Sequence, residues 1–195
     1  MKSSSLYEKA ARAIDEANSK DSNLESADGR LQPKELLYAH RMCEWLEKME
    51  PGASESLKLA ARSQHIERWA IPREEYPMDR NGYIKWRNAL KKFHADRVED
   101  ILLNVGYDET TISRVRDLVM KKGIKSDPDV QLLEDVICLV FLKYYFEDFS
   151  QKHDEEKILR ILQKTWRKMS QKGREMAMKL EMPPSAKKLV EKALA

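Results

Sequence analysis

One stretch of the chain constrains its fold more than any other: DVQLLEDVICLVFLKYYFEDF, residues 129–149. Wound into an α-helix, it is apolar on nearly every face between Val130 and Phe146. A helix that is apolar all round lies in the interior of a protein, where other elements cover each of its faces. We therefore expect a helix over residues 129–150 at the centre of the fold.

The rest of the chain supplies helices to surround it. Apolar residues recur at helical spacing in most segments, and only six glycines with few Val or Thr argue against a β-rich protein. We predict an all-α fold, a single-domain bundle of seven to eight helices over residues 1–182, followed by a short C-terminal amphipathic helix in 183–195. The other expected helices are 5–18, 33–49, 55–70, 83–104, 109–122 and 154–172, with loops at 18–29 and 71–82.

Two acids interrupt the apolar central helix. Asp135 shares a helical face with Leu132 and Leu139, and Glu134 shares one with Val130 and Cys138. A buried carboxylate without a partner costs several kcal/mol or gives up its charge. Each acid therefore needs a cation, which is either an Arg or Lys side chain or a metal ion. A buried Arg–carboxylate pair, or a helix start that is less buried than expected, is the alternative to a metal site.

Three histidines lie beside apolar residues on three other predicted helices. His40 precedes Cys43 by three residues, His65 follows Ala61 by four, and His94 follows Leu90 by four. Imidazole and carboxylate ligands together suit a divalent ion such as Zn, Fe, Mn, Co or Ni. Histidines in the core without a metal are the alternative. The predicted metal ligands are His40, His65, His94 and Asp135, with Glu134 as the catalytic base or as a residue that orients a ligand.

The segment between His65 and His94 is rich in arginine and aromatic residues. Arg side chains bind phosphate or carboxylate through two parallel hydrogen bonds, and aromatic rings offer faces for stacking. This pattern predicts an anionic small molecule or nucleotide as the ligand. A loop that pairs its own Arg73 with Glu74 or Glu75 is the alternative. The predicted substrate-binding residues are Arg68, Arg73, Arg80, Arg87 and Lys91.

The order of these candidates resembles the HD superfamily of all-α, metal-dependent phosphohydrolases. The likeness covers roughly residues 33–145 and rests on His40, His65 and Asp135 within VQLLEDV. It implies an HD-like fold and a metal site that hydrolyses phosphate esters. The His-Asp doublet of that superfamily is absent, because Ile66 follows His65. His94 is the expected replacement for the missing ligand.

A second resemblance covers nearly the whole chain. The segments AIDEANSKDSN, AARSQHIERWAIPREEYPMDRNGYIKWRNALKKFHA, LEDVICLVFL and KTWRKMSQKG resemble the signatures of domain-of-unknown-function family 4202. This resemblance identifies relatives and implies no activity. Function must therefore be argued from the residues.

Location and alternative partners follow from charge and hydropathy. The longest apolar run, VICLVFL, is too short to span a membrane, and the two cysteines suit buried thiols in a reducing compartment. We therefore expect a cytoplasmic protein that does not enter a membrane. Residues 160–179 hold seven Lys or Arg against one acid, Glu175. Such a face either is merely solvated or binds RNA or an acidic partner.

Two functions follow as hypotheses. The first is a metal-dependent hydrolase acting on a phosphorylated or nucleotide-type substrate. The second is a helical adaptor or RNA-binding module that uses the basic face of residues 160–179, with the histidines as structural residues.

Overall fold

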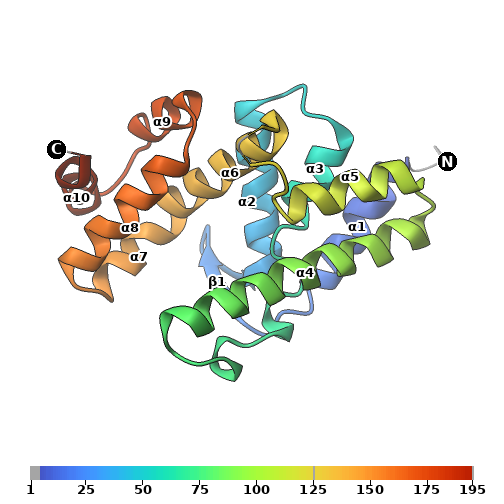
Figure 1. Ribbon diagram of the computed structural model, residues 1–195, viewed down its shortest axis with the longest axis horizontal. Coiled ribbons are helices and arrows are strands. Elements are labelled where there is room, and N and C mark those ends of the chain that lie inside the picture. Colours follow the sequence, from blue (N-terminus) through green and yellow to red (C-terminus); the bar gives the residue numbers. More distant parts are fainter. Residues whose placement is uncertain (1–4, 125, 195) are drawn as a thin grey trace. The chain divides into compact units, whose positions relative to one another are not determined.

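The computed structural model describes residues 5–124 and 126–194 and confirms the predicted fold class (Figure 1). The described residues form ten α-helices and one two-stranded sheet. The chain divides into two compact units, Met1–Gly123 and Ile124–Ala195, which are called the first and second unit below. The predicted boundary between residues 182 and 183 stays a prediction. The helix count exceeds the predicted seven to eight because some predicted helices are interrupted.

The first unit holds the small sheet and five α-helices. Helix α4 lies along α5 and also packs against α1, while α3 packs against α2 and α5. Fully buried side chains such as Ile14, Met42, Leu57 and Leu90 form its core. Its elements are α1 (Leu6–Asn18), β1 (Leu24–Ala27), β2 (Arg30–Pro33), α2 (Lys34–Met49), α3 (Glu55–Arg62), the 3₁₀ turns η1 (Arg68–Ala70) and η2 (Arg73–Glu75), α4 (Arg80–Val105) and α5 (Glu109–Val119).

The predicted loop at 18–29 is wrong in its second half, which begins a β-hairpin. Strands β1 and β2 pair in antiparallel register, with Ala27 opposite Arg30. The two turn residues, Asp28 and Gly29, have φ angles of 51° and 73°. An Asp-Gly pair with both φ positive is the preferred two-residue turn for the twist of a hairpin. The sequence signal was present, but polar flanking residues concealed it.

The predicted helix 55–70 is also wrong in its second half. Helix α3 ends at Arg62, and the hydroxyl of Ser63 donates to the carbonyl of Leu59. The chain then turns, with Glu67 in the left-handed region at φ 48°. His65 therefore lies in a turn and not on a helix. A hydroxyl bonded back to the preceding helical turn competes with continued helix, which helps explain the early end.

The second unit is built around the predicted central helix. That segment forms α6 (Pro128–Val140), a π-helical turn η3 (Phe141–Tyr145) and α7 (Phe146–Gln151). Most of its apolar side chains are buried, including Val130, Leu133 and Phe146. Helix α6 contacts α8 (Glu155–Lys168) and α9 (Gln171–Met178), and α10 (Pro184–Leu194) packs on α7 and α8. The expected burial of this helix is thus confirmed.

The predicted helix 154–172 is two helices. Helix α8 ends at Lys168, and the Ser170 side chain accepts a hydrogen bond from the Gly173 N–H to begin α9. Gly173, which directly follows the predicted range, lies inside the first turn of α9. The short C-terminal helix expected in 183–195 corresponds to α10.

No helix among the described residues combines the length and the apolar character needed to cross a membrane. Neither of the two cysteines, both within the described residues, takes part in a disulfide, and Cys138 is buried while Cys43 is half-buried.

Candidate functional site

The turn after α3 is held in an unusual conformation by contacts from two helices. The backbone N–H of Glu67 donates to Asn18 Oδ1 on α1 at 3.0 Å. The Glu67 carboxylate accepts from Arg97 on α4 at 2.5 and 3.2 Å. His94, also on α4, contacts the Ile66 carbonyl oxygen through Nδ1 at 2.7 Å. A left-handed residue other than glycine is strained, and such strain concentrates at functional sites.

This turn presents His65 and Arg68 to the start of α2. The His65 ring stacks on Tyr38, with centroids 3.9 Å apart and planes at 12°. His65 Nδ1 lies 3.3 Å from Glu35 Oε2, and Nε2 lies 3.4 Å from Arg68 Nη1. Arg68 Nε is 4.0 Å from the second oxygen of Glu35. We call Glu35, Tyr38, His65 and Arg68 the Glu35 cluster.

These contacts assign the proton of the His65 ring. A guanidinium can only donate, so Nε2 of His65 must accept from Arg68. The proton of a neutral ring is then on Nδ1, where it donates to the Glu35 carboxylate. Arg68 and Glu35 therefore fix one tautomer and one ring orientation of His65.

Glu35 is the unusual acid of the first unit. It is 6% exposed, and burial raises its pKa from 4.5 to about 7, with Asp21 adding to the effect and Arg68 and Lys34 opposing it. Asp21 accepts the Glu35 backbone N–H at 3.1 Å, which satisfies an N-terminal donor of α2. A carboxyl group with a pKa near 7 can both donate and accept a proton at neutral pH.

Both histidines of the region are neutral at neutral pH. Burial, followed by the charges of Arg68 and Arg87 among others, holds the pKa of His65 well below its usual 6.5. Burial lowers the pKa of His94 to about 3, although its bond to the Ile66 carbonyl opposes the shift. Because Nδ1 of His94 donates to that carbonyl, Nε2 carries a lone pair. Nε2 is buried and has no hydrogen-bond partner in the described part of the chain.

Trp86 on α4 supports Arg68 from the other side. The Arg68 guanidinium lies over the Trp86 ring at 4.7 Å from its centroid. The indole N–H donates to the Ile71 carbonyl at 2.9 Å, which ties the segment after Arg68 to α4. Trp86 is 9% exposed, so its face is covered by Arg68 and is not an open stacking surface.

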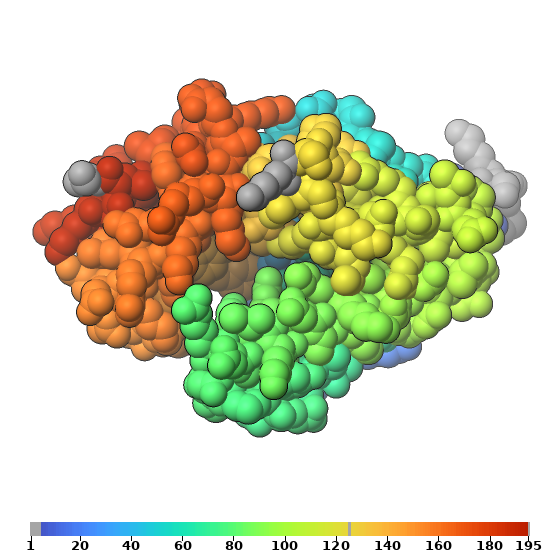
Figure 2. All heavy atoms as spheres, in the orientation of Figure 1, coloured from blue at the N-terminus to red at the C-terminus, as the bar shows by residue number. Residues whose placement is uncertain are grey.

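Arg73, which was predicted to bind substrate or to pair with Glu74 or Glu75, contacts backbone carbonyls of its own loop. Its guanidinium donates to the carbonyl oxygens of Tyr76 at 2.9 Å and Pro77 at 2.8 Å. Gly82 allows the loop to approach α4, because a Cβ there would lie 1.9 Å from the Pro77 carbonyl oxygen. The loop and the start of α4, green in Figure 2, protrude from the surface of the first unit. Arg80 lies there and is exposed.

Arg87 and Lys91, also predicted to bind substrate, lie on the same face of α4 as His94. Positions 87, 91 and 94 are separated by four and three residues, the spacing of one helical face. Both basic residues are half-buried. The His94 ring lies 6.1 Å from the His65 ring, centroid to centroid, so this face is directed toward the Glu35 cluster.

The predicted metal ligands are only partly brought together. His65 and His94 are neighbours, but His40 Nε2 lies 3.3 Å from Asp15 on α1. His40 follows Glu35 by five residues, about 140° around the helix, so it points away from the Glu35 cluster. Among residues 5–124 and 126–194, no three His, Cys, Asp or Glu side chains are grouped so that they could hold a metal ion. The four-residue metal site stays a prediction.

Asp135 lies in the second unit, where it organises the start of α9. Its carboxylate accepts the Ser170 backbone N–H at 2.8 Å, the Ser170 hydroxyl, and the Gln131 side-chain amide at 3.1 Å. A carboxylate at a helix N-terminus is stabilised by such donors without a full cation. Glu134 does have the expected cation, since Lys168 lies 3.2 Å away. Its catalytic role stays a prediction.

The basic segment 160–179 carries the alternative hypothesis. Helix α8 buries Ile158 and Leu162 and exposes Arg160, Lys164 and Arg167. Part of the positive charge is engaged within the unit, since the Arg174 guanidinium lies 5.8 Å from the Trp166 ring. RNA binding by this face stays a prediction.

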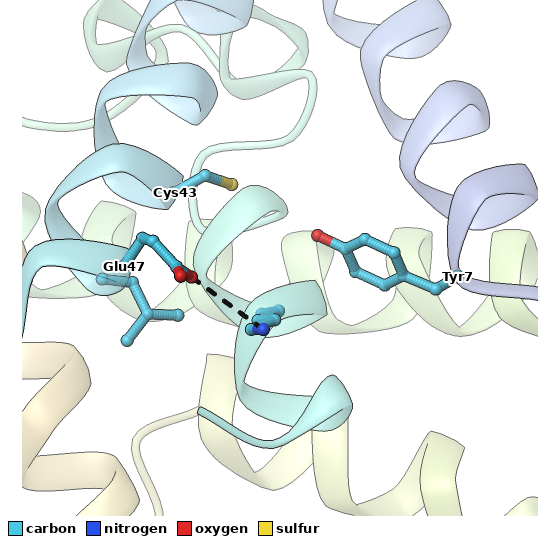
Figure 3. A pocket seen from close by; sticks show the side chains of 5 residues that line it. Tyr7, Cys43 and Glu47 are labelled. Atoms are coloured by element: carbon cyan, nitrogen blue, oxygen red, sulfur yellow. Dashed lines mark ion pairs between the residues drawn. The ribbon is translucent and has the colours of Figure 1, made fainter. Parts of the chain in front are cut away.

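A separate cavity of about 150 Å³ in the first unit is lined by Tyr7, Cys43, Leu46, Glu47 and Lys58. The Tyr7 hydroxyl and the Cys43 thiol point into it, beside the ion pair of Glu47 and Lys58 (Figure 3). Burial raises the pKa of the Cys43 thiol, which makes it a poor nucleophile.

Sequence reasoning missed Glu35 and Tyr38, although a signal existed. Glu35, Tyr38, Met42 and Leu46 lie at helical spacing along one buried stripe of α2. A carboxylate at the end of an apolar stripe is the same kind of signal that singled out Glu134 and Asp135.

Comparison with known proteins places the chain in a family without assigning an activity. No curated protein and no solved structure shows significant similarity to it. The likeness to the HD superfamily is therefore not shown. The model of one family, described as Domain of unknown function (DUF4202), matches residues 8–190. The chain thus belongs to the DUF4202 family over nearly its whole length.

Proposed function

We propose that the protein is a hydrolase for a phosphorylated or nucleotide-type substrate and that the Glu35 cluster is its active site. One observation carries the proposal: a buried carboxyl group with a pKa near 7 lies 3.3 Å from the ring of a neutral histidine. Perturbed acids beside specific partners mark functional sites more often than ordinary surfaces. The strained turn that supplies His65 and Arg68 supports the same conclusion.

The cluster suggests a role for each side chain. Ionised Glu35 takes a proton from water as the water oxygen forms a bond to phosphorus, and the protonated acid returns that proton to the departing oxygen. His65 holds the carboxylate in position through Nδ1–H. Arg68 binds the phosphoryl oxygens, with Trp86 fixing its direction.

A divalent metal ion is a separate part of the hypothesis. His40, His65, His94 and Asp135 are the ligands predicted from the sequence, and a bound ion would lower the pKa of a coordinated water. Metal analysis of protein purified without a histidine tag tests this part. The roles of Glu35 and Arg68 do not depend on its outcome.

A hydrolysis assay on the full chain tests the proposal. The substrates are a panel of phosphomonoesters and nucleotides, each with and without added divalent ions. We expect Glu35→Gln to lower kcat/KM by at least about 100-fold, because general acid–base catalysis typically contributes that much. The wild-type pH profile should show a group titrating near 7 that the variant lacks.

Glu44→Gln is the matched control, since Glu44 is an exposed acid on the same helix that pairs with Lys48. It should leave the rate unchanged. Full activity in Glu35→Gln, or an equal loss in both variants, would remove Glu35 from the mechanism.

A further inference from the structure

The arginines of the first unit differ in their counterions. Four half-buried arginines each have a carboxylate in direct contact. These pairs are Arg41 with Glu25, Arg62 with Asp15 at 2.6 Å, Arg97 with Glu67 at 2.5 Å, and Arg116 with Asp96 at 2.9 Å. Among the described carboxylates, the one beside Arg68 is Glu35, at 4.0 Å. Arg87 has no carboxylate within 4.0 Å in the part of the chain that the structure describes.

The positive charges of Arg68 and Arg87 both affect the region of His65 and His94. Burial first, and the charge of Arg87 as well, lower the pKa of Arg68. Both guanidinium groups also help to hold His65 and His94 in the neutral form. Arg87 lies on the same face of α4 as His94, seven residues before it. The cluster thus holds the Arg68 guanidinium near the charge of Arg87, and Glu35, at 4.0 Å, is the carboxyl group that lies beside Arg68.

A half-buried cation without a counterion is costly, because water solvates it incompletely and no anion offsets the loss. The neighbouring pairs show how the first unit neutralises four other half-buried arginines, and a further one, Arg73, donates to the carbonyl oxygens of its own loop. A bound anion would do the same for Arg68 and Arg87. A singly charged carboxylate would leave positive charge over, whereas a doubly charged oxyanion matches two guanidinium groups and accepts hydrogen bonds on several sides.

We infer that Arg68 and Arg87 form a subsite for a doubly charged tetrahedral oxyanion, the phosphate group of a phosphomonoester. This inference rests on the proposed function, because it assigns the substrate's phosphate to the same cluster. It names Arg87 as a substrate-binding residue and a phosphomonoester as the substrate class. The buried Nε2 of His94 has no hydrogen-bond partner among the described residues, and His94 lies on the same face of α4 as Arg87.

Sulfate is the probe that tests the subsite, since its charge stays fixed from pH 6 to 8, and inorganic phosphate is the second probe. Binding to the full chain is measured by calorimetry at constant ionic strength, with acetate as the singly charged comparison. We expect one sulfate per chain and no heat with acetate. Arg87→Gln should weaken sulfate binding at least 10-fold.

Lys85→Gln is the matched control, because it removes the same charge from an exposed position on α4, about 160° around the helix from position 87. It should leave the affinity unchanged. A second measurement guards against a folding defect. In anion-free buffer Arg87→Gln should melt at or above the wild-type temperature, and sulfate should raise the melting temperature of the wild type alone.

The outcomes separate this inference from the proposed function. Equal losses in Arg87→Gln and Lys85→Gln, or equal binding of acetate, would mean an adventitious ion only and would overturn the subsite. Sulfate binding that needs Arg87, in a protein whose hydrolysis does not depend on Glu35, would keep the subsite and reject the hydrolase. Hydrolysis that depends on Glu35 but not on Arg87 would keep the hydrolase and reject the subsite.

Discussion

The buried Glu35 carboxyl predicts a specific dependence of stability on pH. In the unfolded chain a glutamate ionises near pH 4.5, whereas folding raises the pKa of Glu35 to about 7. Between these values the folded state binds more protons than the unfolded state. The free energy of unfolding therefore falls as pH rises through this window. Below about pH 4.5 both states hold the proton, and the full stability is present.

The magnitude follows from the size of the shift. A pKa raised from 4.5 to about 7 corresponds to about 3 kcal/mol of stability lost between pH 4.5 and 8. Glu35→Gln cannot ionise and lacks this decline. The difference in unfolding free energy, variant minus wild type, should therefore rise by about 3 kcal/mol over the same window. Any pH-independent loss of stability caused by the substitution, such as the lost contact with Arg68, does not affect how this difference changes with pH.

Urea unfolding followed by tryptophan fluorescence measures this difference. Trp45, Trp69 and Trp86 lie in the first unit, so a Trp166→Phe background confines the signal to the unit that holds Glu35. Carbon-13 labelling of glutamate carboxyls gives the Glu35 titration directly by NMR, with an expected midpoint near 7. A pH-independent difference together with a midpoint below 5 would refute the reasoning. Glu44→Gln should give a constant difference.

Two further predictions concern the second unit. Gly173→Ala should lower the stability of this unit by about 1–3 kcal/mol, because the new Cβ would lie 2.6 Å from Asp135 Cγ. Gly52→Ala is the control, since its Cβ would meet only a Glu50 side-chain atom at 3.8 Å, and it should change little in a parallel urea titration. Asp135→Asn should lower stability by about 1–3 kcal/mol in metal-free protein without changing metal content, since its amide nitrogen cannot accept from the Ser170 hydroxyl or N–H. Loss of metal at unchanged stability would instead make Asp135 a ligand.

Sequence patterns predicted elements well where local signals were strong. The all-round apolar character of 129–149 located the core helix of the second unit, and apolar periodicity located α1, α2 and α4. The predicted helix ends were wrong where a single side chain competes with continuation of the helix. Ser63 bonded to Leu59, and Ser170 capping α9, each stopped a helix inside an otherwise continuous pattern.

The candidate site was predicted in part, for a physical reason. His65 and His94 stood out because they lie beside apolar residues, and Arg68 and Arg87 stood out because guanidinium groups bind phosphate or carboxylate. Grouping these residues with His40 required their distances in space, which sequence spacing between different elements does not determine. His40 shares α2 with Glu35, yet the two differ by about 140° around the helix, and only Glu35 faces the turn after α3.

The turn itself explains why Glu35 escaped notice. Its environment is made by residues far away in the sequence: Asn18 and Arg97 fix Glu67, and Glu67 sets the direction of the chain on either side. Only in that conformation do His65 and Arg68 meet the start of α2 and cover Glu35. The raised pKa of Glu35 is therefore a property of the folded turn more than of its own helix. A relaxed turn, as in Glu67→Gly without its bond to Arg97, should admit water to Glu35 and bring its NMR titration midpoint down toward 4.5.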